Sequence, residues 1–210
     1  MIEIIEPGYE IVSYIPESRD LLKEMERVAR TCYKSEDKII EGSAERLIGN
    51  LIKSGHEAMI EFGPSITVKF ICDRGVSHEL VRHRLCSFAQ ESQRYVRYDS
   101  GIKFIRPIYL DKEDETYRMW LNAMSIAEEY YSKLIMKGLK PQEARAVLPN
   151  STATTINVKA NLREWRHLLK LRTAKDAHPQ IRQICIPLLK DFKERIPIVF
   201  DDINIEGETY

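Results

Sequence analysis

Apolar residues recur along the chain with two different periods, and these periods predict its secondary structure. Ile66, Val68, Phe70 and Cys72 stand at every second position, which is typical of a strand with one buried face. In residues 19–33 the apolar positions instead recur three and four apart, which predicts an amphipathic helix. The chain therefore contains both strands and helices.

The same patterns, with proline, glycine and capping residues as boundaries, predict the other elements. We expect further helices at 43–55, 76–85, 113–137, 141–148, 162–173 and 180–195, strands at 9–14, 103–106 and 153–158, and an extended segment at 90–98. Helices and strands do not alternate in regular βαβ units. This order predicts an α+β fold with a mixed or antiparallel sheet flanked by helices. The length suits one core, so we expect residues 1–210 to form a single domain.

Composition narrows the class of protein. With 43% hydrophobic and 30% charged residues, the chain is typical of a globular protein. Its 32 basic residues balance 32 acidic ones, so general attraction to nucleic acid or to a membrane surface is not expected. No apolar run is long enough to span a bilayer and the first residues lack a secretory signal, which predicts a cytoplasmic protein. The four scattered cysteines suggest free thiols.

One segment departs from this balance of charge. Between Arg82 and Arg97 lie four arginines, which include Arg84 and Arg94, against the single acid Glu91. One guanidinium group can bind two phosphate oxygens at once, and it keeps its charge in any environment. The segment therefore indicates a local site for an anion. The alternative is a solvated basic surface, because clusters of surface arginines are common.

The predicted helix 76–85 constrains how these arginines can act. It would place Arg82 and Arg84 about 200° apart, so that the two side chains face different ligands. Ser87 and Ser92 offer hydroxyl groups to the same anions. Ser92 as a nucleophile would need a general base, which no local motif supplies, so contact with a phosphate or a base is the favoured role.

A second arginine stands out on the predicted helix 162–173. Leu162, Trp165, Leu168 and Leu169 form an apolar stripe, and helical spacing places Arg172 within it. A guanidinium on a buried face needs an anionic partner or strong acceptors. That partner is either a carboxylate of this protein or an anionic ligand, and the spacing does not distinguish them.

The run RHRLCSFAQESQRY at 82–95 resembles the signature of the flavin-dependent thymidylate synthases, Arg-His-Arg followed by seven residues and Ser. Residues 55–61 resemble that family's Gly-His-x-x-x-x-Glu element, and residues 144–149 resemble its Ala-Arg-x-x-Leu-Pro segment. The similarity extends from about residue 29 to about residue 200. Ala58 departs from the pattern, since a hydroxyl residue is common there, and His178 lies in a segment that departs from it through Pro179.

The resemblance implies an enzyme that converts dUMP to dTMP. Methylenetetrahydrofolate would donate the carbon, and FAD reduced by NADPH would donate the hydride, in a homotetramer with active sites at subunit interfaces. No metal is implied. The implied catalytic residues are His56, Ser92 and Arg172. The implied FAD contacts are Arg82, His83, Arg84, Gln90, Glu61, Asn161, Arg163 and His167. The implied dUMP contacts are Glu79, Arg82, Gln90, Glu91, Ser92, Gln93, Arg94, Arg145 and Arg172.

Three rival functions remain. A zinc hydrolase could use His78 and His83, but five residues of spacing places them about 140° apart on a helix. An RNA-binding module could stack bases on Tyr95 and Tyr98, which the zero net charge disfavours. Cys86 could act as a thiolate nucleophile activated by the neighbouring arginines, although a buried free cysteine is the commoner case.

Overall fold

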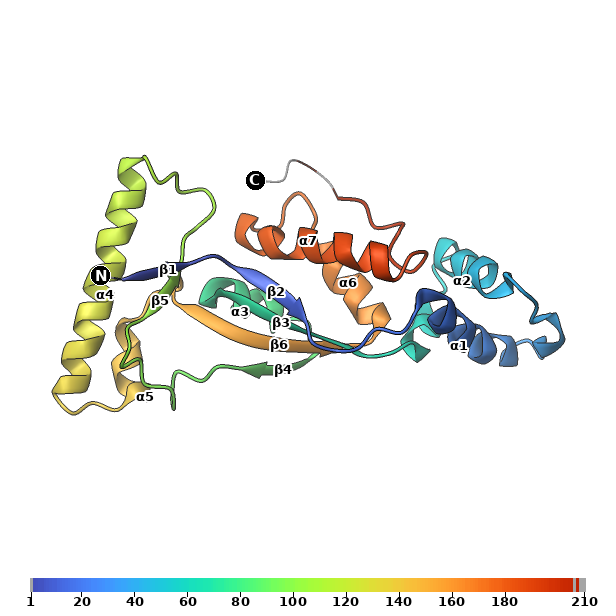
Figure 1. Cartoon of the computed structure of the whole chain (residues 1–210), viewed down its shortest axis with the longest axis horizontal. Helices are drawn as coiled ribbons and strands as arrows, with labels where there is room; N and C mark the ends of the chain where they lie inside the picture. The colour runs from blue at the N-terminus through green and yellow to red at the C-terminus, as the bar shows by residue number, and fades with distance from the viewer. Residues whose placement is uncertain (1, 206, 208–210) are drawn as a thin grey trace.

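A four-stranded antiparallel sheet lies at the centre of the computed structural model, which describes residues 2–205 and 207 (Figure 1). Its strand order is β2 (Gly8–Ile11), β3 (Ile66–Asp73), β6 (Ala153–Ala160) and β4 (Ser87–Gln90). Strands β3 and β6 pair over eight residues, from Ile66 opposite Ala160 to Asp73 opposite Ala153. The α+β prediction, with an antiparallel sheet flanked by helices, is confirmed.

A short parallel pair continues the fold beyond one end of this sheet. It consists of β1 (Glu3–Ile5) and β5 (Lys103–Ile105). A bridge between Phe104 and Thr152 connects the pair to the segment that leads into β6. The first strand lies outside the predicted elements because three residues are too few to show a period.

Helices lie over one face of the sheet and at both of its ends (Figure 1). Over the face lie α6 (Leu162–Arg172) and α7 (Pro179–Arg195), while α3 (Arg74–Leu80) directly follows β3. At one end α1 (Ser18–Thr31) packs on α2 (Ser43–Lys53), and at the other lie α4 (Glu115–Met136) and α5 (Pro141–Ala144). Three 3₁₀ turns join them: η1 (Glu36–Lys38), η2 (Glu57–Phe62) and η3 (Arg145–Val147). Among the described residues, no helix is both long and apolar enough to cross a bilayer.

Aromatic side chains join the sheet to the two helices that cover it. The buried ring of Trp165 on α6 lies 6.4 Å from that of Phe70 on β3 and 5.6 Å from that of Phe192 on α7. Its indole N–H donates to the carbonyl of Ile66 at 3.0 Å, so the one polar atom of this buried side chain has a hydrogen-bond partner. These contacts fix the position of α6 against β3 and α7, and α6 carries much of the candidate site.

The predicted helix 76–85 is wrong in its second half. Helix α3 begins at Arg74, capped by the side chain of Asp73, and ends at Leu80. Residues 81–85 form turns instead, because Ser87 must enter β4 and pair with Lys159 of β6. The helical angle between Arg82 and Arg84 therefore does not apply.

Three further boundaries differ from the predictions. Strand β2 ends at Ile11, whereas the pattern predicted an element to residue 14. The segment 90–98 is extended only at its start, since the residues after Gln90 turn away from the sheet. Helix α1 begins at Ser18, one residue before its predicted start, and the cap position of Glu17 has no side-chain hydrogen bond. The predicted helix 141–148 is the short helix α5 followed by the 3₁₀ turn η3. The remaining predicted helices and strands agree within about two residues, the usual uncertainty of element ends.

Candidate functional site

A polar cavity of about 710 Å³ lies between η2, the turn at 81–85 and α6. It is lined by Glu57, Glu61, Arg82, His83, Arg84, Leu85, Asn161, Arg163, Glu164, His167, Leu171 and Arg172. Eight of the residues that the resemblance implied for FAD or dUMP therefore share one cavity, although they come from three separate parts of the sequence. Arginines outnumber glutamates by four to three in this lining, which suits an anionic ligand.

The start of α6 determines which of its side chains face the cavity. The Asn161 side chain accepts a hydrogen bond from the backbone N–H of Glu164 at 2.9 Å, so the helix begins at Leu162. Leu162 then turns into the core, while Arg163 and His167, four residues apart, share an exposed face. Both residues, which the resemblance implied for FAD, therefore point away from the core.

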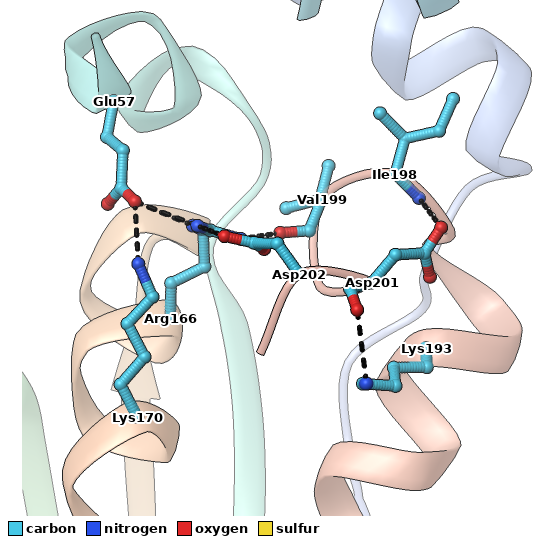
Figure 2. A network of polar contacts seen from close by, with 8 residues as sticks. All are labelled: Glu57, Arg166, Lys170, Lys193, Ile198, Val199, Asp201 and Asp202. Atoms are coloured by element: carbon cyan, nitrogen blue, oxygen red, sulfur yellow. Dashed lines mark hydrogen bonds and ion pairs between the residues drawn. The ribbon is translucent and has the colours of Figure 1, made fainter. Parts of the chain in front are cut away.

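A buried arginine of α6 holds η2, which forms the opposite wall of the cavity (Figure 2). Arg166 of α6 is fully buried and binds Glu57 of η2 at 2.8 Å, Asp202 at 2.6 Å and the carbonyl oxygen of Val199. Lys170 adds a further bond to Glu57 at 2.9 Å. Partial burial opposes ionisation of Glu57, but these cations outweigh it and lower the pKa of its carboxyl group. The network ties η2, and so one wall of the cavity, to α6.

Arg172 is held by three of its N–H groups. Its Nε donates to Nε2 of His83 at 3.0 Å, and its two terminal nitrogens donate to the carboxylate and the carbonyl of Glu79 at 2.8 and 3.0 Å. A guanidinium group has five N–H donors, so two have no partner among the described residues. The side chain is 20% exposed and lines the cavity. Arg172 thus presents a fixed, charged pair of donors to a ligand.

This geometry corrects the expectation that Arg172 lies on the buried face of α6. The helix ends at Arg172, so its side chain reaches past the core, and the buried guanidinium on this helix is Arg166. Of the two kinds of partner left open, the structure shows a carboxylate of this protein, that of Glu79.

His83 lies buried between Arg172 and the first turn of α6. Burial, the Arg172 charge and His167 lower the pKa of His83 to about 4. Its imidazole is therefore neutral near pH 7 and can accept the N–H of Arg172. The His167 ring meets it edge-on, with ring centroids 5.7 Å apart.

The arginines on either side of His83 have no carboxylate partner among the described residues. Arg82 and Arg84 are both exposed and both line the cavity, so they do not lie on opposite faces of a helix as predicted. In contrast, Arg163 forms an ion pair with Glu61 at 2.5 Å, with both side chains about half exposed. The cavity mouth therefore holds two uncompensated positive charges, which an anion would neutralise.

His56 does not share this cavity. It lies on the other side of η2, where it lines a second cavity of about 530 Å³ with Ala58 and Met59, while Glu57 and Glu61 face the first. Periodicity could not show this, because the six residues of η2 form a 3₁₀ turn, in which each side chain points about 120° away from the one before it.

Seven other predicted contacts also lie outside the lining of the first cavity: Glu79, which binds Arg172, and Gln90, Glu91, Ser92, Gln93, Arg94 and Arg145. Gln90 donates from β4 to Ser77 at 2.9 Å. The Ser92 hydroxyl accepts the backbone N–H of Arg94 at 3.2 Å, and the Arg94 guanidinium lies over the Tyr95 ring. Arg145 is exposed in η3 and forms no ion pair among the described residues. Apart from Glu79, these residues therefore do not line the Arg172 cavity of their own chain.

The surroundings of Cys86 and His78 argue against two of the rival functions, the thiolate nucleophile and the zinc hydrolase. Burial, and then the carboxylate of Glu164, whose Oε1 is 3.9 Å from the sulfur, raise the pKa of Cys86 to about 12, so it is a thiol and not a nucleophile. His78 is exposed and does not line the cavity with His83. The pattern did not single out Glu164, although an asparagine followed three residues later by a glutamate is a known signal for a helix start.

An antiparallel sheet with one covered face and an arginine-lined cavity beside α6 suit a protein that binds an anionic ligand. The chain belongs to the thymidylate synthase complementing protein family, Thy1, whose model matches residues 10–198. It is 33% identical over 198 residues to the flavin-dependent thymidylate synthase of Corynebacterium aurimucosum, with 86% of this chain and 79% of that protein covered. The enzyme of the same name from Pyrococcus furiosus is 32% identical over 174 residues, with 81% and 69% covered.

A solved structure agrees with this assignment. The UMP/dUMP methylase PolB from Streptomyces cacaoi, bound with 5-Br dUMP, superposes with a TM-score of 0.80 at 25% identity. The match covers 95% of this chain and 96% of PolB, so the whole fold is shared.

Proposed function

We propose that this protein is a flavin-dependent thymidylate synthase. It converts dUMP to dTMP, with methylenetetrahydrofolate as the one-carbon donor and NADPH as the source of reducing equivalents. Membership in the Thy1 family and the relatives of that name support the reaction. The observation that carries the proposal is the Arg172 guanidinium, which is fixed by His83 and Glu79 and keeps two N–H donors for a ligand.

Arg172 suits the pyrimidine of dUMP. A uracil ring offers carbonyl oxygens, and two parallel N–H donors can bind such acceptors together. Negative charge on the ring, as in its ionised form, makes C5 nucleophilic toward the one-carbon unit. A guanidinium that is already oriented stabilises this charge without reorganising, which is the usual source of electrostatic catalysis.

The same cavity suits FAD, whose pyrophosphate is anionic. Arg82 and Arg84 have no carboxylate partner among the described residues and would bind this group, while Arg163, Asn161 and His167 line the adjacent wall. His83 and Glu61 would complete the contacts. When bound, FAD supplies the hydride that completes the methyl group. The protein's part is to bind the two ligands side by side and to exclude other acceptors.

The remaining predicted contacts require a second subunit. Ser92, Gln93, Arg94 and Arg145 offer hydroxyl, amide and guanidinium groups for a phosphate, yet they do not line the Arg172 cavity of their own chain. We therefore propose a cytoplasmic homotetramer in which these groups, with Gln90 and Glu91, meet the Arg172 cavity of a neighbouring subunit. His56 would reach the flavin from the second cavity.

Purified protein tests this proposal directly. We expect a yellow protein with an oxidised-flavin spectrum, a mass by light scattering four times the 24.5 kDa of one chain, and dTMP formation that requires NADPH and methylenetetrahydrofolate. NADPH should bleach the flavin faster when dUMP is present. A colourless protein that neither retains added FAD nor binds dUMP would refute the proposal.

A further inference from the structure

Glu164 is a buried carboxylate with weak partners. It lies in the first turn of α6 and is 6% exposed. Its described side-chain contacts are the thiol of Cys86, 3.9 Å away, and Nδ1 of His83, 3.7 Å away. Another buried glutamate, Glu26, instead binds Arg30 at 2.8 Å and the Ser43 hydroxyl at 2.9 Å. Buried carboxylates normally have such strong partners, so the position of Glu164 calls for a reason.

The hydrogen bond between His83 and Arg172 supplies a reason for the position of Glu164. A guanidinium group can only donate, so Nε2 of His83 must carry a lone pair to accept the N–H of Arg172 at 3.0 Å. The single proton of the neutral imidazole must then be on Nδ1. The Nδ1 atom faces Oε1 of Glu164, which is an acceptor. His83 therefore lies between an acceptor, the Glu164 carboxylate, and a donor, the Arg172 guanidinium.

We propose that Glu164 is a positioning residue: its carboxylate favours the Nδ1–H form of His83, which keeps Nε2 available to orient Arg172 toward the ligand. Glu164 need not touch the substrate for this role. The link to dUMP rests on the proposed function, whereas the link to the state of His83 does not. Carboxylates fix the tautomer of a neighbouring imidazole in the same way around many metal-binding histidines.

A metal site is the competing explanation. Ligand atoms of His83, Glu164 and His167 all lie within 4.8 Å of one another, which is compact enough for an ion. A metal on Nδ1 of neutral His83 would, however, move the ring proton to Nε2, where it would face the N–H of Arg172. The cavity also holds more arginines than glutamates, which repels a cation.

The state of His83 can be measured directly. With ¹⁵N-labelled histidine, the two tautomers give different ring nitrogen shifts, and five histidines in the sequence keep the spectrum simple. Loss of one signal set in His83→Gln identifies His83. We expect the Nδ1–H form in the wild-type protein and in Glu164→Gln, which keeps an acceptor oxygen, and a shift toward Nε2–H in Glu164→Leu.

Ligand affinity provides the second readout. We expect Glu164→Leu to bind dUMP about tenfold more weakly, the effect of losing one hydrogen bond to a charged group, and Glu164→Gln to stay close to wild type. Glu26→Gln is the matched control, because it alters a buried helical glutamate outside the cavity: it should lower the melting temperature and leave the tautomer and dUMP affinity unchanged.

Three results would overturn the positioning role. One is an Nε2–H form of His83 in the wild-type protein; another is a Glu164→Leu variant whose tautomer and dUMP affinity equal those of wild type. The third is tight binding of added Co²⁺ that shifts the signals of His83 and His167. Each leaves flavin content and dTMP formation in the wild type as separate measurements, so failure here is distinguishable from failure of the proposed function.

Discussion

Substitution of Arg172 by alanine separates the two tasks of this side chain, ligand binding and local structure. The variant removes a side chain that lines the cavity, with two N–H donors that have no partner among the described residues and three that bind His83 and Glu79. Hydrogen bonds to charged groups contribute about 1.5–3 kcal/mol each. Loss of two such bonds to the pyrimidine amounts to about 3–6 kcal/mol, or roughly 10²- to 10⁴-fold in catalytic efficiency.

The structural cost should be much smaller. The Arg172 and Glu79 side chains are 20% and 29% exposed, so solvent screens their ion pair, and its loss should cost about 1 kcal/mol or less. For a chain of this length that corresponds to a decrease of about 2–4 °C in melting temperature.

The assay compares dTMP formation, dUMP titration and thermal unfolding in Arg172→Ala and wild type. Arg172→Lys serves as the matched variant, because it keeps the charge but cannot offer the paired donors. We expect both variants to fold, to retain FAD and to lose activity, the alanine variant most. Turnover at the wild-type rate in Arg172→Ala would refute the role assigned to this arginine. A collapse of the melting temperature would show that its three internal bonds dominate.

Two further predictions concern the network in Figure 2. Arg166→Met should lower the free energy of unfolding by about 3 kcal/mol, since it leaves Glu57 and Asp202 without their shared cation; denaturant titration measures this, and an unchanged midpoint would contradict it. Hydrogen bonds to Arg166 lower the pKa of the Asp202 carboxyl group. Burial opposes the ionisation of Glu57, but its bonds to Arg166 and Lys170 outweigh this effect and lower its pKa. Both carboxylates therefore stabilise the folded state above their ordinary pKa values of 3.8 and 4.5. That stability should be lost as the pH falls through the lowered values, and the pH dependence of unfolding should be flatter in Arg166→Met.

Much of the fold could be predicted because it depends on local periodicity. The alternation in β3 and the apolar stripe of α6 are properties of short segments, and both elements appear within one or two residues of the predicted bounds. The end of α3 could not be predicted in the same way. It depends on the pairing of Ser87 with Lys159, a contact between segments far apart in the sequence.

The candidate site shows the same division. The arginine cluster at 82–97 and the helix from Asn161 indicated anion binding, and the structure brings Arg82, Arg84 and Arg172 to one cavity. Helical spacing could not decide whether Arg166 or Arg172 is buried, because the answer depends on where the helix stops and on the positions of Glu57 and Asp202. Glu164 was missed because its partners come from a turn some eighty residues earlier.

The 3₁₀ turn η2 is a partition shared by two chambers. Glu57 and Glu61 face one cavity, and Ala58 and Met59 face the other, within six consecutive residues. An insertion or deletion of one residue in this stretch would turn every following side chain of the 3₁₀ turn by about 120° and so change the lining of both cavities. The two chambers therefore cannot change independently in this segment, and the effect of a length variant there cannot be attributed to either chamber alone.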